Sequence, residues 1–404
     1  MQANQPRLAS AYGTLAPPGS RKALAGFFVS GTLFAFPGAI VPAWGHNFSS
    51  DYWMVGLYFV ALIMGLLAAA RLAPVLMEKK GLGAALALAC AAAALALFYL
   101  AFVSPPFGPW WRMPGLLLLG CGAGVLHAAI FHAISPIYRH DPAATVNLGG
   151  ILFGLGCLAS ALLVALAFYA YTPAAIQIFL GLIPGFFAIG YARSKFSPDP
   201  APNPAAHKIA DEIRSPAAVL FSLVLFFQFG NEWAIAGWLP LYLTQRLGIS
   251  PASSIMILAL YWGALLIGRV IAQAVLPLVR HTRLLTGSVS LAVFACVILL
   301  FTDNRFGAVT AVLLLGGAFA PIYPLVVEKI GRRFPDYHPG FYNGIFSFAI
   351  AAGLLAPCTL GYFAWAMGLG AVMALPLTGS VIVFILLAIL WLEARLSAAA
   401  GEAR

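Results

Sequence analysis

Residues 58–74, YFVALIMGLLAAARLAP, and residues 261–277, YWGALLIGRVIAQAVLP, align with each other without a gap. In the same register the identical pairs include Pro37 with Pro240, Gly45 with Gly248, Tyr58 with Tyr261, Ala61 with Ala264, Leu62 with Leu265, Gly65 with Gly268, Ala69 with Ala272, and Pro74 with Pro277. Apolar residues often match by chance, but matched proline, tyrosine and glycine residues are rarer. A repeat at about half the chain length indicates two structurally similar halves.

Hydrophobic residues make up 62% of the 404-residue chain and charged residues 8%, whereas soluble domains carry about 25% charged residues. An α-helix needs about 20 apolar residues to cross the hydrocarbon core. Stretches of that length predict an all-α polytopic membrane protein with twelve transmembrane helices. The predicted spans are residues 22–45, 52–77, 82–103, 113–137, 144–171, 173–193, 217–244, 252–279, 282–302, 307–330, 340–365 and 371–392.

A polar, proline-rich stretch, residues 194–216, separates six spans from six and is typical of an extended linker. We expect a tail at 1–21, a six-helix bundle at 22–193, the linker, a second six-helix bundle at 217–393 and a tail at 394–404. A second, weaker register aligns LLLG at 117–120 with LLLG at 313–316, and Asn147 with Asn343. Both registers fit parallel repeats, which are related by an axis along the membrane normal.

Lysine and arginine residues are distributed unevenly between the two sides of this topology. One side holds Arg7, Arg21, Lys22, Arg71, Lys79, Lys80, Arg139, Arg193, Lys195, Lys208, Arg214, Arg280, Arg283, Lys329, Arg332, Arg333, Arg395 and Arg404, and the other holds Arg112, Arg246 and Arg305. Because cytoplasmic loops are enriched in basic residues, we expect both termini in the cytoplasm and a location in the inner membrane. The anionic membrane surface then accounts for the net charge of +10 without a nucleic-acid partner. The polar start of the chain does not resemble a cleavable signal.

The topology and one loop motif resemble the major facilitator superfamily of transporters, and the resemblance covers essentially the whole chain. The signature of that family between helices 2 and 3 is a glycine, an acid–base pair and a glycine with basic residues. Here the stretch is PVLMEKKGLG, residues 74–83, in which Glu78, Lys79 and Gly81 fit, whereas Pro74 replaces the first glycine and the trailing basic residues are missing. The resemblance implies two pseudo-symmetric six-helix bundles, with helices 1, 4, 7 and 10 lining a central cavity.

Residues 230–250, GNEWAIAGWLPLYLTQRLGIS, are similar to a helix-7 stretch of the fucose, galactose and glucose transporter group and of vertebrate sodium-dependent glucose transporters. ALLIGRV in helix 8 and GGAFAPIYPLVVEKIG in helix 10 fit that group too. Fucose-type members place carboxylates in helices 1 and 4, whereas here helix 1 has no acid and helix 4 carries His127 and His132. The proton-coupling role of those carboxylates therefore cannot be assigned to residues of this chain.

Glu232 lies in the middle of an apolar run, and an ionisable group there costs roughly 2.5–3.5 kcal/mol by insertion scales. Such a group indicates a functional site unless it only forms a structural hydrogen bond or ion pair with another helix. We expect Glu232 to contact solute or to carry a coupling ion. Gln228, Asn231 and Trp238 lie near it in the same helix and are further candidates for solute binding.

His127 and its repeat partner Tyr323 are the expected pair across the cavity, and His127 can carry a proton near neutral pH. A helix–helix hydrogen bond is the alternative for His127. For Arg269 we expect a gating ion pair with Glu328 or, alternatively, with Glu232. Asn147, Asn343, Tyr261 and Trp262 are secondary candidates, of which Trp262 could instead be an interfacial anchor. The five cysteines, each in a different span, predict free thiols, and we expect no metal site.

The leading hypothesis is a secondary transporter that moves a small polar solute by alternating access, with a sugar-like solute favoured. Coupling to a proton or sodium gradient and simple facilitation both stay open, and no cofactor is expected. The alternatives are an efflux carrier or flippase for amphipathic compounds or lipids and, from another class, an integral-membrane transferase. The transferase is disfavoured because no outer loop exceeds about ten residues. We expect no enzyme activity and a monomer in the bilayer.

Overall fold

The computed structural model describes residues 18–46, 51–140, 142–194, 196, 215–275, 278–334 and 339–402. Within these ranges the side chains of residues 18, 136–140, 142–144, 273, 339–347, 352 and 397–402 are not described. The linker residues 195 and 197–214 lie outside the described residues, so the expected domain boundaries stay a prediction. So do Arg7, Lys195, Lys208, Arg214 and Arg404, and the side chains of Arg139 and Asn343.

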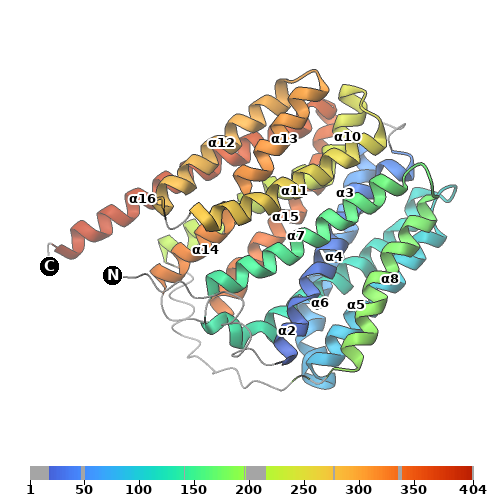
Figure 1. The fold of residues 1–404 in the computed structure, drawn as a ribbon, viewed down its shortest axis with the longest axis horizontal. Helices are drawn as coiled ribbons and strands as arrows, with labels where there is room; N and C mark the ends of the chain where they lie inside the picture. Colours follow the sequence, from blue (N-terminus) through green and yellow to red (C-terminus); the bar gives the residue numbers. More distant parts are fainter. Residues whose placement is uncertain are drawn as a thin grey trace.

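The described residues form α-helices joined by turns and short 3₁₀ helices (Figure 1). The elements are α2 (Pro18–Leu24), α3 (Gly26–Ile40), η1 (Pro42–Trp44), α4 (Tyr52–Lys80), α5 (Leu82–Phe102), η2 (Pro109–Trp111), α6 (Arg112–His140), α7 (Pro142–Ala167), α8 (Pro173–Ala192), α10 (Pro216–Leu247), α11 (Pro251–Val275), α12 (His281–Phe301), α13 (Arg305–Phe319), α14 (Ile322–Arg333), α15 (Pro339–Met367), η3 (Leu369–Met373) and α16 (Ala374–Glu402).

Within the described residues, 12 segments are long and apolar enough to cross a membrane, and they coincide with the spans predicted from the sequence. The all-α, twelve-span prediction is therefore confirmed. The span Arg305–Arg333 differs from a single helix, because it breaks into α13 and α14. Pro321 lies at this break, where it has no backbone N–H to continue the hydrogen-bond ladder.

Two helices, α8 and α10, begin at a polar cap followed by proline, which explains where these spans start. The Ser215 hydroxyl accepts a hydrogen bond from the backbone N–H of Ala218, and Pro216 is the first residue of α10. Thr172 and Pro173 open α8 in the same way. A side-chain oxygen at the N-cap satisfies a free N–H, and proline fits the first turn because that turn has no use for its missing donor.

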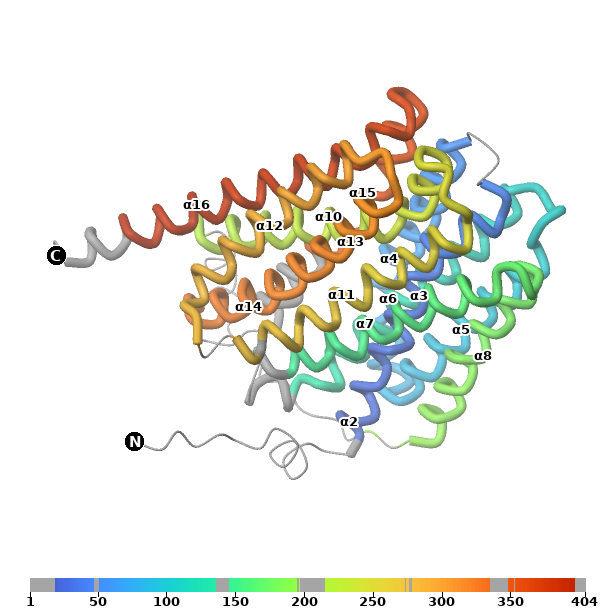
Figure 2. The backbone as a smooth tube through the Cα atoms, turned by 45° about the horizontal axis from the view of Figure 1, so that its top comes forward, coloured from blue at the N-terminus to red at the C-terminus, as the bar shows by residue number. Residues whose placement is uncertain are grey.

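Helices α2–α8 form one half and α10–α16 the other, and the two halves lie side by side in Figures 1 and 2. Within the first half, α3 packs on α7 and α4 on α6; within the second, α10 packs on α15 and α11 on α13. Glycine allows the closest of these approaches. A Cβ atom added at Gly31 of α3 would lie 1.9 Å from the carbonyl oxygen of Phe153 in α7, so no larger residue fits there.

Among the described residues, the main contacts between the halves are those of α3 with α10, α4 with α15, α7 with α11 and α7 with α14. We call the end of the bundle where α4 and α16 end the terminal face, and the end that carries η1, η2 and η3 the distal face.

Near the distal face the contact is tight. A Cβ atom on Gly38 would lie 2.0 Å from the carbonyl oxygen of Ala236. The Tyr52 hydroxyl donates to Gln245 Oε1 at 2.6 Å, and Gln245 Nε2 donates to the carbonyl oxygen of His46 at 2.7 Å. These contacts join the first half to the second, so the distal end of the bundle is closed.

Candidate functional site

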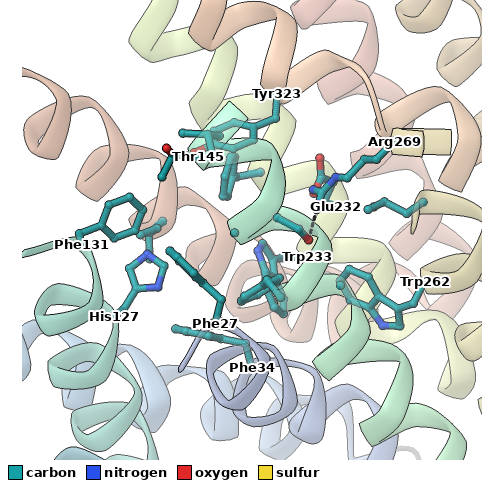
Figure 3. Close-up of a pocket in the computed structure, with 18 of the residues that line it drawn as sticks. Phe27, Phe34, His127, Phe131, Thr145, Glu232, Trp233, Trp262, Arg269 and Tyr323 are labelled. Carbon is teal, nitrogen blue, oxygen red and sulfur yellow. Dashed lines mark hydrogen bonds between the residues drawn. The ribbon is translucent and has the colours of Figure 1, made fainter. Parts of the chain in front are cut away.

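A cavity lies between the two halves, and its walls come from α3, α6 and α7 of the first half and from α10, α11, α14 and α15 of the second (Figure 3). A volume of about 100 Å³ is open to the centre of a water molecule, whereas a single water needs about 10–15 Å³ by that measure. The cavity therefore has room for a small solute. It extends from the middle of the bundle toward the terminal face, because Ile134 and Thr145 also line it.

Glu232 brings a carboxylate to the wall of this cavity, near the midpoint of α10. Its side chain is buried, with 7% of its surface exposed. Gln228, one turn earlier on α10, donates from Nε2 to Glu232 Oε1 at 2.9 Å. This bond orients the carboxylate without supplying a counter-charge. Among the described residues, the ion pairs within 4.0 Å do not include Glu232.

Arg269 on α11 reaches the same cavity from the second half. Its Nη1 donates to the carbonyl oxygen of Gly150 on α7, and its Nε is buried without a hydrogen-bond partner. Gly150 makes this approach possible, because a Cβ atom there would lie 2.7 Å from Arg269 Nη1. Arg269 therefore joins the two halves on the terminal side of Glu232, and Figure 3 shows both side chains on the same wall.

The ion pair between Arg269 and Glu328 expected from the sequence is absent, so that expectation is wrong for this conformation. Glu328 on α14 instead forms ion pairs with His281 at 2.9 Å and with Arg332 at 2.5 Å. Arg332 lies one helical turn from Glu328, and the start of α12 brings His281 alongside. Both partners are closer to the terminal face than Arg269, and they satisfy the carboxylate there.

His127 and Tyr323 both line the cavity, on different walls, as Figure 3 shows. A hydrogen bond of 3.4 Å joins His127 Nδ1 to the hydroxyl of Ser30 on α3. The Tyr323 ring packs edge-on against Phe229, with 5.2 Å between the ring centres. His132 is exposed and does not line the cavity. Two polar residues singled out from the sequence therefore line the cavity, from helices α6 and α14.

Seven further aromatic residues line the cavity, and most of them do not stand out in the sequence pattern. They are Phe27, Phe34, Phe131, Phe153, Phe229, Trp233 and Trp262. Phe34 of the first half and Trp233 of the second are in contact, with 5.6 Å between their ring centres and their planes tilted by 58°, so aromatic contact closes the cavity toward the distal face. Trp262 is 2% exposed, which contradicts the alternative that it is an interfacial anchor. One signal was available, because Phe27 and Phe34 lie two turns apart on one face of α3.

Four further candidates lie outside the cavity lining in this conformation. Trp238 donates from Nε1 to the carbonyl oxygen of Pro357 at 2.8 Å, and thereby ties α10 to α15. Asn231 donates from Nδ2 to the Ser380 hydroxyl at 3.3 Å, toward α16. Both residues point to other helices because they occupy other faces of α10 than Glu232. Asn147 is buried on α7 but does not line the cavity, and Tyr261 is also buried behind it.

The part of the chain that the structure describes holds no cluster of three or more His, Cys, Asp or Glu side chains that could bind a metal ion. Cys90, Cys121, Cys157, Cys296 and Cys358 are free and are buried or half-buried.

The sequence and the structure of the chain were compared with those of known proteins. The model of the Major Facilitator Superfamily matches residues 139–357, more than half of the chain. Among solved structures, a D-xylose–proton symporter aligns with a TM-score of 0.70 and 14% identity, over 91% of this chain and 96% of that chain. The E. coli fucose:proton symporter aligns with a TM-score of 0.59 and 14% identity, over 92% and 98% of the two chains.

A nucleoside transporter aligns with a TM-score of 0.68 and 12% identity, over 92% of this chain and 99% of that chain. No curated protein matches the sequence significantly. At such identities the structural likeness shows the fold, and the sugar–proton symporters among the neighbours agree with the resemblance found in the sequence. The chain is a multi-pass membrane protein of the Major Facilitator Superfamily of transporters.

Proposed function

We propose that the protein is a secondary transporter that moves a small, sugar-like solute across the membrane by alternating access through this cavity. The observation that carries the proposal is a solute-sized cavity on the boundary between the halves, with the buried carboxylate Glu232 in its wall. Buried ionisable groups in membrane bundles typically mark ion or solute pathways. The aromatic rings supply faces on which a sugar ring can pack, and His127 and Tyr323 supply polar partners.

Coupling to a proton gradient is the second part of the proposal, with Glu232 as the residue that exchanges the proton. Among the described residues no ion pair within 4.0 Å includes Glu232, so its ionised form is costly in the buried wall of the cavity. Protonation removes this cost and lets the cavity close around the solute. A sodium ion would need several oxygen ligands, whereas among the described residues the Glu232 carboxylate is hydrogen-bonded to the amide nitrogen of Gln228.

We further propose that the terminal face lies in the cytoplasm and that the protein resides in the inner membrane. The basic ends of α4 and α14, with Lys79, Lys80, Arg332 and Arg333, support this orientation. The closed distal face then corresponds to an inward-facing state.

Transport of an amphipathic compound is a second candidate, favoured by the aromatic lining of the cavity. Aromatic walls accept apolar ring systems as well as sugar faces. An amphipathic dye in the same assay as the sugars tests this candidate directly.

The test is solute exchange in proteoliposomes, with hexoses, pentoses, nucleosides and an amphipathic dye as probes. Trp233→Ala changes the cavity wall, and Trp391→Ala, an exposed position on α16, is the matched control. We expect at least one sugar-like probe to exchange, with Trp233→Ala impaired and Trp391→Ala normal. Exchange of the dye alone would favour transport of an amphipathic compound over transport of a sugar-like solute. Exchange of no probe would contradict both candidate functions.

A further inference from the structure

The guanidinium of Arg269 has hydrogen-bonding capacity that the protein does not use. The side chain is 8% exposed and lines the cavity. Among the described residues it forms one hydrogen bond, from Nη1 to the carbonyl oxygen of Gly150, and Nε is buried without a partner. With Nη1 occupied, the edge formed by Nε and Nη2 stays unpaired. This edge presents two parallel N–H donors, the geometry that binds both oxygens of a carboxylate.

Protonation of Glu232 would change the net charge of the cavity wall. Glu232 and Arg269 are the residues of opposite formal charge in its wall, and they do not form an ion pair. The ionisable groups that interact electrostatically with Glu232 are Arg269 and Tyr261 on α11, Tyr323 on α14 and Cys157 on α7. His127 on α6 lies on another wall of the cavity. Once Glu232 is protonated, Arg269 is left as a buried cation without a counter-charge.

We propose that the solute carries one carboxylate, which binds the free edge of Arg269 while Glu232 is protonated. This inference rests on the proposed function and names the class of its solute, a small ring-shaped monocarboxylate such as a sugar acid. The charges of the empty cavity, one negative on Glu232 and one positive on Arg269, then sum to zero. In the loaded cavity the solute carboxylate replaces the negative charge of the protonated Glu232, so the net charge is again zero. A neutral sugar would leave Arg269 uncompensated, and a dianionic phosphate would leave an excess negative charge. The aromatic walls contact the ring of the solute.

Matched pairs of probes that differ in one carboxylate test this proposal. D-glucose with D-glucuronate and benzyl alcohol with benzoate are compared by ligand-induced thermal stabilisation and by calorimetric binding to the purified protein. We expect at least one carboxylate to bind about ten- to a hundredfold more tightly than its neutral partner, because hydrogen bonds to charged groups are the stronger ones. Equal binding within both pairs, or no binding of any probe, overturns the proposal.

Variants assign the effect to the two charged residues. Arg269→Gln should abolish the preference for the carboxylate, and Arg269→Lys should weaken it while keeping the charge. Arg283→Gln, at an exposed position on α12, is the control and should leave the preference unchanged. An Arg269→Gln protein that elutes as a folded monodisperse peak and keeps the preference contradicts the assignment.

Proton linkage gives a readout that needs no Arg269 variant. Carboxylate binding to the wild-type protein should weaken by up to about tenfold per pH unit as Glu232 ionises, and Glu232→Gln should make it independent of pH. Wild-type binding that does not change with pH overturns the linked protonation. In proteoliposomes, accumulation of glucose but not of glucuronate contradicts the proposal that the solute carries a carboxylate, and it leaves the transport proposal standing. If no probe accumulates, the proposed proton coupling is contradicted, and if no probe even exchanges, the transport proposal itself is contradicted.

Discussion

Gly38 on α3 is the residue at which the two halves approach most closely near the distal face. In Gly38→Ala the new Cβ atom would lie 2.0 Å from the carbonyl oxygen of Ala236 on α10. Ordinary van der Waals contact begins at 3.4 Å, so α3 and α10 must separate by about 1.4 Å. The carbonyl oxygen is part of the helix backbone, and the position of the Cβ atom is fixed by the backbone of α3. Rotation of a side chain therefore cannot relieve the clash.

Separation on this scale also stretches the two hydrogen bonds of Gln245, at 2.6 Å and 2.7 Å, which join the halves beside Gly38. Each hydrogen bond contributes about 1 kcal/mol, so their loss shifts the balance toward a distally open state by roughly 2 kcal/mol, or about 30-fold. The assay is energy transfer between dyes at positions 107 and 306, which are exposed near the distal ends of the two halves. We expect a longer mean distance in Gly38→Ala.

Two other glycines make the experiment specific. Gly31→Ala creates an equally severe clash, 1.9 Å from the carbonyl oxygen of Phe153, but within the first half. It should lower the thermal stability without changing the distance between the dyes. Gly190→Ala on α8 has no atom within 4 Å of its Cβ and should change neither property. An unchanged dye distance in Gly38→Ala, or an equal change in Gly31→Ala, refutes the reasoning.

Further predictions concern pH, packing and the cavity. Burial and the nearby charge of Arg112 lower the pKa of His46 from 6.5 to about 4, so the unfolded state takes up a proton first and stability falls as the pH drops from 6.5 toward 4. Between pH 7.5 and 4.5 this should cost roughly 2–3 kcal/mol, measured as a decrease in Tm that His46→Gln lacks; an equal decrease in that variant contradicts the assignment. Trp238→Phe should lower the stability by about 1 kcal/mol, because it removes the hydrogen bond to Pro357 at 2.8 Å, and an unchanged Tm would show that this bond contributes nothing. Gly150→Ala should push Arg269 off its carbonyl partner, because the new Cβ would lie 2.7 Å from Nη1, and should slow exchange in proteoliposomes; wild-type exchange would mean that this contact does not matter for transport.

The spans and the repeat could be predicted because the bilayer imposes them on composition. A helix must be apolar for about 20 residues to cross hydrocarbon, and this requirement leaves a clear pattern in the chain. Gly81 shows how far local chemistry can be followed, since its φ of 82° turns α4 into α5 at the position the loop motif gives to glycine. The break at Pro321 was harder to anticipate, because proline also occurs inside unbroken spans such as α10.

Part of the polar lining of the cavity could be predicted, since a polar group in an apolar run stands out. Glu232, His127, Tyr323 and Arg269 all line it. The aromatic walls could not be predicted in full, because Phe153 or Trp233 facing a cavity looks the same in sequence as an aromatic residue facing lipid.

Pairings across helices were the least predictable feature. Neighbours in sequence need not share a surface, and Asn231 precedes Glu232 directly yet bonds to α16. The choice between Glu328 and Gly150 as the partner of Arg269 depends on how deeply α7 approaches α11. That depth is set by small residues packed at the contact, and a single sequence does not reveal it.

The central claim is that Glu232 couples solute movement to protons through the cavity between the halves. The direct measurement is accumulation of a solute identified by exchange, in proteoliposomes with a gradient of one pH unit, for the wild-type protein and Glu232→Gln. One proton per solute predicts about tenfold accumulation in the wild type. Glu232→Gln should still exchange solute but accumulate none. Wild-type accumulation in Glu232→Gln, with normal exchange, would contradict the claim.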